Sequence, residues 1–486
     1  MAENNKKNRG TIYVPLQDVL MVFFAGVALL FLIIILLCFI HKFQKKPEDV
    51  IDLINLENTF TSYVFLGGIF TMFLFLLCVL FRCVARLNNP DVISVTLEYV
   101  DSHGKLVSMT KVIDKKNKDE KKLKARRFQK LSQLDETYPK KERVVPTQGL
   151  TLEYICRRFR SYASRIEGNP LYYSIQDIRR FITSLGCTKI LILQGMSGTG
   201  KTSLPVAWGR FTGVQTTVIP VQPMWKERSD LIGYYNEFTG KFNESMLLEK
   251  LYEANKTNKM FLIVLDEMNI ARVEYYFAEF LSLLELPTVK ERILEVTTIV
   301  SKKDPKELKN GNLILPNNVT FIGTANNDDS TFAISDKVYD RSMIMNLDYR
   351  CEPFVGEDDF EPITISQDLF TELVNKAKRE YALTKRGRNR IKEFDNFLTK
   401  TFSVTFGNRI RRQIEQYVPI YIACGGTETE ALDDLLAKKV LRKLESTNPL
   451  VLKNKSEELI AKINEIFGQD EMEVCIATIR KLIMNV

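Results

Sequence analysis

The most constraining feature of this sequence is an octet at residues 195–202, Gly-Met-Ser-Gly-Thr-Gly-Lys-Thr, which matches the pattern GxxxxGK[ST]. An apolar run at residues 189–194 precedes it, and such a run between turn signals is typical of a buried strand. Glycines let successive backbone N–H groups turn inward around phosphate oxygens, and a following helix adds the positive end of its dipole. The octet therefore predicts a strand, a phosphate-binding loop and a helix, in that order.

Each residue type in this octet suits one part of a bound nucleoside triphosphate. Lys201 would place a point charge on the β- and γ-phosphates, and Thr202 would offer its hydroxyl to Mg²⁺. The residues assigned to nucleotide binding in this loop are Gly195, Ser197, Gly198, Thr199, Gly200, Lys201 and Thr202. The predicted cofactors are therefore a nucleoside triphosphate and Mg²⁺.

Two further apolar runs end in polar residues that such a site needs. The run at 261–265 leads directly into Asp266 and Glu267. Asp266 would support the Mg²⁺ shell, and Glu267 would polarise the attacking water. The run at 319–323 leads to Asn326, which would hold that water near the γ-phosphate; the alternative is an asparagine that only forms a turn.

A cation for the neighbouring subunit is expected at Arg341, which follows Asp340 after a short helical stretch. It could reach a phosphate in trans, or it could form a surface ion pair with Asp340.

The numbers of histidines and cysteines limit the other kinds of site that the chain can form. His41 and His103 are the two histidines of the chain, and neither lies in the catalytic part, which excludes a histidine-based zinc site or a Ser-His-Asp triad there. Eight cysteines without a CxxC pair predict reduced thiols.

Strand-like and helical stretches alternate through the middle of the chain. Apolar runs typical of strands occur at 189–194, 216–221, 260–265, 319–323 and 343–347. A capping box at 174–177, Ser-Ile-Gln-Asp, opens a helix that continues to about residue 185. Beyond residue 349 amphipathic helical patterns run to the end of the sequence. This order predicts an α/β fold with a parallel sheet covered on both faces, followed by a helical domain.

Two stretches near the N-terminus, residues 19–40 and 58–81, contain no charged side chain. About 20 apolar residues span a hydrocarbon core of about 30 Å, so each stretch can form a transmembrane helix. The alternatives are buried core helices or, for the first stretch, a signal peptide, whose apolar part is usually shorter. Lys and Arg residues before the first stretch and after the second predict that both ends, and thus the catalytic domain, are cytoplasmic.

The segment after the second stretch combines a predicted hairpin with a basic run. Alternation at 93–99, turn residues at 101–104 and a further strand-like run at 106–109 indicate a small β-hairpin. Residues 114–130 hold nine Lys or Arg against three acids. Such a run is most simply a solvated helix or linker. Contact with anionic lipid is a sharper interpretation, and nucleic-acid binding is a third.

Across residues 171–426 the motifs, in order and spacing, resemble the AAA+ family that contains the McrB-type restriction NTPases and the dynein-related ATPases. Besides the octet, the matching segments are Val-Gln-Pro-Met-Trp at 221–225, Asp-Leu-Ile-Gly-Tyr-Tyr at 230–235, Asp-Glu-Met-Asn at 266–269, Phe-Ala-Glu-Phe at 277–280, Leu-Glu at 284–285, Gly-Thr-Ala-Asn at 323–326, Lys-Val-Tyr-Asp-Arg at 337–341 and Gly-Asn-Arg-Ile-Arg-Arg-Gln-Ile at 407–414. The resemblance implies an AAA+ P-loop core with a helical lid, assembly into a homo-oligomeric and usually hexameric ring, and nucleotide bound between neighbours.

The resemblance also implies roles for single residues. Lys201 and Thr202 would form Walker A, and Asp266 and Glu267 would form Walker B. The remaining roles are sensor 1 for Asn326, the arginine finger for Arg341, and sensor 2 for Arg409, with Arg411 and Arg412 as competitors for the last. The stretch after sensor 1 ends in a single Asp-Arg step at 340–341, which is closer to the dynein-related form. This resemblance to the dynein-related form favours ATP over GTP as the nucleotide.

Seven segments are expected along the chain. They are a cytoplasmic tail at 1–16, transmembrane helices at 17–41 and 59–82 around an extracytoplasmic loop at 42–58, a hairpin and basic linker at 83–170, the AAA+ core at 171–350 and the helical lid at 351–486. The leading hypothesis is a membrane-anchored ATPase ring that remodels or switches a target. The alternatives are a nucleotide-dependent membrane scaffold and the NTPase subunit of a McrB-like defence complex that acts with a separate nuclease.

Overall fold

The computed structural model of the 486-residue chain describes residues 126–326 and 331–484, together with four short strands nearer the N-terminus. The chain divides into two compact units, Met1–Lys124 and Ala125–Val486. In the first unit, β1 (Thr11–Ile12) pairs with β2 (Val95–Thr96) in antiparallel fashion. The strands β3 (Glu98–Val100) and β4 (Leu106–Ser108) also pair antiparallel, where the sequence predicts a hairpin.

The two expected transmembrane stretches, 19–40 and 58–81, lie outside the described residues. Within the part of the chain that the structure describes, no helix is both long enough and apolar enough to cross a bilayer. Membrane anchoring therefore stays a prediction from the sequence.

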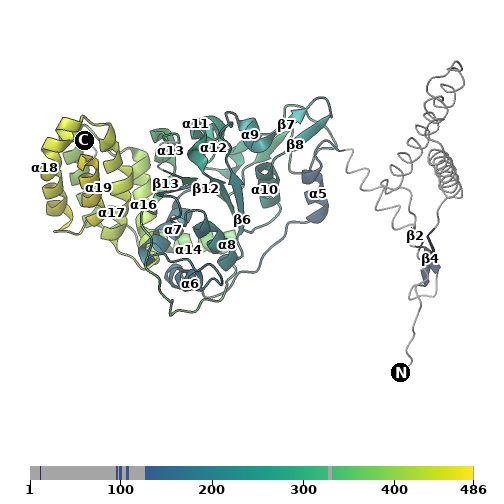
Figure 1. Ribbon diagram of the computed structural model, residues 1–486, viewed down its shortest axis with the longest axis horizontal. Coiled ribbons are helices and arrows are strands. Elements are labelled where there is room, and N and C mark those ends of the chain that lie inside the picture. Colours follow the sequence, from purple (N-terminus) through teal and green to yellow (C-terminus); the bar gives the residue numbers. More distant parts are fainter. Residues whose placement is uncertain are drawn as a thin grey trace, which may run out of the picture. The chain divides into compact units, whose positions relative to one another are not determined.

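A five-stranded parallel sheet forms the centre of the second unit (Figure 1). Its strands are β5 (Ile190–Gln194), β6 (Gln215–Pro220), β9 (Phe261–Asp266), β12 (Val319–Ala325) and β13 (Met343–Asn346). They lie in the order β13-β5-β12-β9-β6, and every neighbouring pair is parallel. The five predicted strands and the parallel sheet are confirmed, with ends that differ by one or two residues.

Both faces of the sheet are buried, because successive side chains of each strand point to opposite sides. Leu191 and Leu193 of β5 belong to one apolar cluster, whereas Ile190 and Ile192 belong to the other. The first cluster includes α6 (Leu152–Ser164), α7 (Ile175–Cys187) and α8 (Ser203–Thr212). The second includes α5 (Lys130–Thr137), α9 (Arg228–Ile232), α10 (Met246–Ala254), α11 (Val273–Tyr276) and α12 (Ala278–Leu283).

Helix α7 begins where the sequence predicts, but its N-terminus is held differently. The Ser174 hydroxyl accepts a hydrogen bond from the backbone N–H of Asp177 at 3.0 Å, as an N-cap does. The Asp177 carboxylate accepts from the Ser174 hydroxyl at 2.7 Å and pairs with Arg180 at 3.3 Å. The predicted serine cap is therefore confirmed. Asp177, the acidic residue of the predicted capping box, instead contacts the side chains of Ser174 and Arg180.

Two small antiparallel hairpins were not predicted. The first joins β7 (Gly233–Asn236) to β8 (Lys241–Glu244), and the second joins β10 (Ile293–Glu295) to β11 (Asn312–Ile314). Each strand has only three or four residues, too few for the alternation of apolar and polar residues to stand out. Three 3₁₀ turns, Met268–Ile270, Val289–Glu291 and Leu441–Ser446, complete the connections of the described core and helical region.

The helical domain predicted after residue 349 is confirmed (Figure 1). Its helices are α14 (Gln367–Glu380), α15 (Lys385–Phe402), α16 (Asn408–Ala423), α17 (Glu428–Lys439), α18 (Pro449–Phe467) and α19 (Glu473–Met484). Helices α14 and α16 pack on α7, so the apolar cluster on one face of the sheet continues into the helical domain. Core and lid therefore share a hydrophobic interior.

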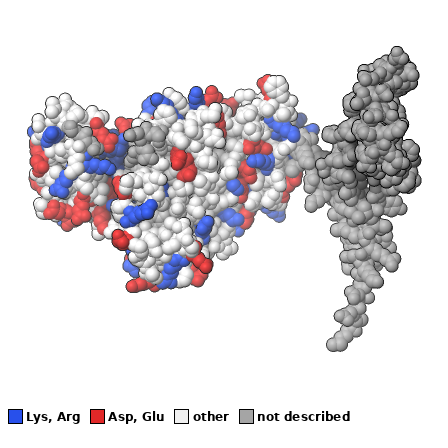
Figure 2. Space-filling view, in the orientation of Figure 1, with Lys and Arg blue, Asp and Glu red and all other residues white. Residues whose placement is uncertain are grey.

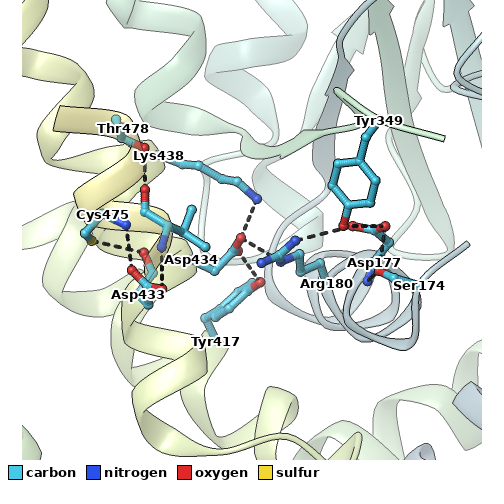
Figure 3. Close-up of polar contacts among 11 residues, drawn as sticks. Ser174, Asp177, Arg180, Tyr349, Tyr417, Asp433, Asp434, Lys438, Cys475 and Thr478 are labelled. Atoms are coloured by element: carbon cyan, nitrogen blue, oxygen red, sulfur yellow. Dashed lines mark hydrogen bonds and ion pairs between the residues drawn. The ribbon is translucent and has the colours of Figure 1, made fainter. Parts of the chain in front are cut away.

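A buried ion network also joins the core to the lid (Figure 3). Arg180 of α7 pairs with Asp434 of α17 at 2.9 Å, and Asp434 also binds Lys438 and accepts a hydrogen bond from the Tyr417 hydroxyl at 2.7 Å. Burial alone would raise the pKa of Asp434, but the charges of Lys438 and Arg180 hold it below its ordinary value. An ionised carboxylate that is only 1% exposed thus links α7, α16 and α17.

Candidate active site

The phosphate-binding loop lies between the end of β5 and the start of α8, as the octet predicts. Gly198 and Gly200 have φ angles of 78° and 88°, in the left-handed region that side chains rarely adopt. Gly195 is required for space, because a Cβ atom there would lie 2.3 Å from the carbonyl oxygen of Leu347. These glycines let the backbone curl tightly against the neighbouring strand β13.

Lys201 is folded into this loop. Its side chain is almost fully buried, and its Nζ donates to the carbonyl oxygens of Gly195 at 3.0 Å and Met196 at 2.7 Å. Tyr173 closes the other end of the loop, because its hydroxyl donates to the Gly200 carbonyl at 3.0 Å. Burial raises the pKa of this Tyr173 phenol, so it stays a donor at neutral pH. The loop is thus held in a curled form around its own lysine.

Thr202 and Asp266 are brought together although they are 64 residues apart. The Thr202 hydroxyl donates to Oδ1 of Asp266 at 2.6 Å, and the Thr324 hydroxyl donates to the same oxygen at 2.8 Å. Thr324 in turn accepts a hydrogen bond from the backbone N–H of Glu267 at 2.8 Å. Thr324 was missed by the sequence analysis as a site residue. The signal was its position two residues before Asn326, at the end of a strand.

Glu267 has a φ angle of 53° and lies in the left-handed region immediately after β9. A residue other than glycine there is uncommon, and such conformations are concentrated at functional sites. The hydrogen bond from its N–H to Thr324 fixes the turn. The carboxylates of Asp266 and Glu267 therefore leave the strand end from two adjacent residues of different backbone conformation.

Asn326 follows β12, the strand that lies between β5 and β9. Buried Asn269 holds it: the Asn269 side-chain amide donates to the Asn326 carbonyl at 2.8 Å and accepts from the Asn326 N–H at 3.3 Å. In the parallel register Ala325 lies opposite Gln194, the last residue before the loop. The sheet thus places Asn326 between the phosphate loop and the acidic pair.

The residues present fit Mg²⁺. A threonine hydroxyl and a carboxylate, Thr202 and Asp266, share one hydrogen bond at the mouth of the loop. Mg²⁺ typically takes one or two protein oxygens and completes its shell with phosphate oxygens and water. Among the described residues no cluster of three or more His, Cys, Asp or Glu could hold a metal by itself. The donor set therefore suits a metal that arrives with a nucleotide.

A cavity of about 270 Å³ opens beside the first turn of α8. It is lined by Thr202, Ser203, Val206 and Ala207 at the start of α8, and by Ile166, Glu167, Asn169 and Leu171 from the segment between α6 and α7. Apolar side chains next to the first helical turn after a phosphate loop offer a surface on which a planar base can stack. Arg210 also lines the cavity.

The arginines proposed from the sequence lie elsewhere. Arg341 ends α13 (Asp336–Arg341), and Arg409 lies in the first turn of α16. Both pair with Glu285: Arg341 Nε donates to its Oε2 at 2.8 Å, and Arg409 Nε lies 2.7 Å from its Oε1. This cluster is at the start of β13 and β5, whereas the phosphate loop follows the end of β5.

Arg409 is therefore not brought to the loop of its own chain, as a sensor 2 residue acting in cis would be. Arg411 and Arg412 are the other candidates for sensor 2. Arg411 pairs with Asp395 at 2.6 Å, whereas Arg412 lines a cavity at the start of β5 together with Arg341 and Arg409. The arginine cluster lies at the start of β5 and the phosphate loop at its end. A five-residue strand puts these two points roughly 15 Å apart, at about 3.3 Å per residue.

A parallel sheet in this order, with a GxxxxGK[ST] loop after one strand and an Asp-Glu pair after another, defines a P-loop NTPase domain. Comparison with known families makes this more specific. Residues 190–342 match the model of the AAA domain of the dynein-related subfamily, which supports an ATPase of the AAA+ type. Residues 362–485, which contain helices α14 to α19, match a domain of unknown function, DUF8727.

A solved structure of a candidate ATPase from Cytophaga hutchinsonii is similar to this chain at 15% identity, with 64% of this chain and 93% of that chain covered and a TM-score of 0.40. None of the curated proteins compared with the chain is similar to it.

Proposed function

We propose that this protein is a membrane-anchored AAA+ ATPase that assembles into a ring, usually of six subunits in such proteins, and uses Mg²⁺-dependent ATP hydrolysis to remodel or switch a target. The observation that carries the proposal is the position of Arg341. It lies at the opposite end of the β5–β13 pair from Lys201, Asp266 and Glu267. A neighbouring subunit in a head-to-tail ring would bring this arginine to a nucleotide.

Each site residue then has one task. Lys201 exchanges its contacts with the loop carbonyls for the β- and γ-phosphates, and the loop N–H groups surround them. Thr202 and Asp266 would hold Mg²⁺, which would supply positive charge to the phosphate oxygens. Glu267 orients and polarises the attacking water, and Asn326 holds that water on the γ-phosphate side. Arg341 of the neighbour stabilises the charge of the transition state.

ATP is the proposed nucleotide because the dynein-related motifs favour it. Parallel turnover measurements with ATP and GTP test this choice. A lower KM and equal or higher kcat with GTP would contradict it.

Mixing two inactive variants tests the ring. Lys201→Ala disables the loop, and Arg341→Ala disables the trans arginine. In a random ring about a quarter of interfaces would combine an intact loop with an intact arginine, so an equal mixture should regain ATPase activity. Lys201→Ala mixed with Glu267→Gln is the matched control, because both changes lie on the loop side of an interface and this mixture should stay inactive. Absence of recovery in the first mixture would rule out hydrolysis completed in trans.

The membrane anchor is supported by residues 19–40 and 58–81, neither of which contains a charged residue. The full chain should stay in membranes washed with alkaline carbonate, whereas a chain beginning at residue 90 should be released. The basic run at 114–130 would then lie close to the membrane and could contact anionic lipid.

The target would be expected at the bilayer. On the face shown in Figure 2, Lys and Arg side chains lie among Asp and Glu, and no single basic patch stands out among the described residues. This face offers no support for a role in DNA binding. ATPase activity that rose only with DNA, or nuclease activity that appeared with a partner, would instead favour the defence-complex alternative.

A further inference from the structure

A cavity of about 550 Å³ lies at the start of β5, at the other end of that strand from the phosphate loop. Its lining is strongly cationic. The charged residues around it are Lys189, Arg292, Arg341, Arg409 and Arg412, with Glu285 as the one carboxylate among the lining residues. Such an excess of like charge costs free energy unless an anion balances it.

Arg292 has the smallest exposed fraction of these cations, at 9%. Its Nε and Nη2 donate to the Leu286 carbonyl at 3.1 and 2.9 Å. The third nitrogen, Nη1, is buried and has no hydrogen-bond partner in the described part of the chain. Buried guanidinium groups are normally paired, so an unpaired nitrogen at a cavity wall indicates a missing acceptor.

Lys189 lies beside it, immediately before β5. No ion pair or hydrogen bond of its ammonium is found among the described residues. Burial, together with the charge of Arg292, lowers the pKa of Lys189 to about 8. An anion in the cavity would stabilise the charged ammonium and so raise the pKa of Lys189 again.

Glu285 occupies the outer part of this cavity as an internal anion. It binds Arg341 through Oε2, and Arg409 through both carboxylate oxygens, at 2.7 to 3.1 Å. The three side chains are between a quarter and a half exposed, so these contacts are open to exchange with another anion. Within the described ranges no carboxylate forms an ion pair with Arg292 or Lys189.

We propose that this cavity is a phosphate-binding site, separate from the P-loop, in which Arg292 and Lys189 make the inner contacts and Glu285 holds Arg341 and Arg409 until a phosphate displaces it. Guanidinium groups match the geometry of phosphate oxygens, and several converge here on a volume larger than one phosphate needs. The phosphate could belong to the nucleotide of a neighbouring subunit, in which case the inference rests on the proposed ring, or to free pyrophosphate.

Pyrophosphate titration of the purified full chain, followed by calorimetry, tests the site. All proteins carry Lys201→Ala, which weakens binding at the P-loop. We expect saturable binding that Lys189→Met and Arg292→Lys each weaken at least about tenfold, as loss of a charge-assisted contact would. Lys392→Met, an exposed cation on α15 outside the cavity, should leave the affinity unchanged.

Glu285→Gln is the decisive variant, because it removes the internal competitor without emptying the cavity. It should strengthen pyrophosphate binding severalfold, whereas a purely structural Glu285 would give weaker binding or none. No binding, or binding insensitive to Lys189→Met, Arg292→Lys and Glu285→Gln alike, would overturn the proposal.

The source of the phosphate is distinguished by a second measurement. If it is the neighbour's nucleotide, Lys189→Met with an intact Lys201 lowers kcat of the assembled ATPase and leaves nucleotide binding to the P-loop unchanged. If it is free pyrophosphate, Lys189→Met leaves kcat unchanged and weakens only the titration. Failure of the mixed-subunit experiment would count against the ring, but it would leave the pyrophosphate result intact.

Discussion

The hydroxyl of Thr324 donates a hydrogen bond of 2.8 Å to Oδ1 of Asp266, the same oxygen that accepts from Thr202. Since Thr324 also accepts from the N–H of Glu267, one side chain orients both acidic residues. The group that would carry Mg²⁺ and the group that would polarise water are therefore positioned together.

Replacing Thr324 with valine, which has nearly the same shape, should lower kcat of the ATPase about 10- to 100-fold, because small displacements of positioned groups have effects of this size. Thr324→Ser keeps the hydroxyl and should retain most of the activity. Steady-state kinetics over a range of Mg²⁺ concentrations provides the measurement. Equal kcat in the valine variant and the unaltered protein would exclude an orienting role.

Glu267→Gln should bind nucleotide normally but hydrolyse it about 10²- to 10⁴-fold more slowly, because the amide cannot accept a proton from water. Single-turnover hydrolysis and equilibrium nucleotide binding separate the two effects. A variant that lost binding as well would show that Glu267 mainly maintains the strained turn at φ 53°.

Lys439 connects the lid to the helix that carries Arg341. From the end of α17 its ammonium donates to the carbonyl oxygens of Tyr339 and Ser342, on either side of the end of α13. Lys439→Met should leave the P-loop intact and lower the ATPase activity of the ring, since Arg341 loses its support. Nucleotide affinity of the variant is the control, and a parallel loss of affinity would contradict this specific role.

Burial lowers the pKa of Lys439 to about 7, which gives a pH dependence with a definite sign. Below pH 7 both folded and unfolded chains hold the proton, so the folded state bears the full cost of a buried charge. Between pH 7 and about 10.5 the folded chain has released it, and its free energy of unfolding rises relative to Lys439→Met by a few kcal/mol. Denaturant unfolding of both proteins at pH 6.5 and 9.5 measures this difference.

Asp434→Asn should destabilise the chain by roughly 3–5 kcal/mol, because Arg180 and Lys438 would be left as buried, unpaired cations. The neighbouring Asp433 is the matched control. It accepts the N–H groups of Val474 and Cys475 at 2.8 Å each. Its change to Asn keeps one acceptor oxygen and weakens one hydrogen bond, so it should cost about 1 kcal/mol.

The contribution of Asp434 has the same sign of pH dependence as that of Lys439, because both pKa values are lowered in the folded chain, but it changes in the acid range. The pKa of Asp434 is held below its ordinary value, so its contribution is present above that value and is lost as the pH falls through the folded-state pKa. The stability gap between the unaltered protein and Asp434→Asn should therefore narrow in acid. A gap that stayed constant would indicate a packing defect instead of a lost charge.

Much of the core could be predicted because its signals are contiguous. Each of these signals lies within a few neighbouring residues. They are the octet at 195–202, the apolar runs that form β5, β9 and β12, and the serine cap of α7. The two hairpins escaped prediction because their strands are short. The orienting role of Thr324 escaped it because both of its partners lie 57 or 58 residues away in the sequence.

By itself the sequence determined that the chain contains a P-loop, an acidic strand end and a candidate asparagine, because loop geometry and strand burial follow from local residue types. Only the tertiary structure decided where the arginines lie. Arg341 and Arg409 meet Glu285 across separations of 56 and 124 residues, at the end of the sheet away from the loop. Ion pairs of such separation depend on how helices pack on the sheet, which no local pattern encodes.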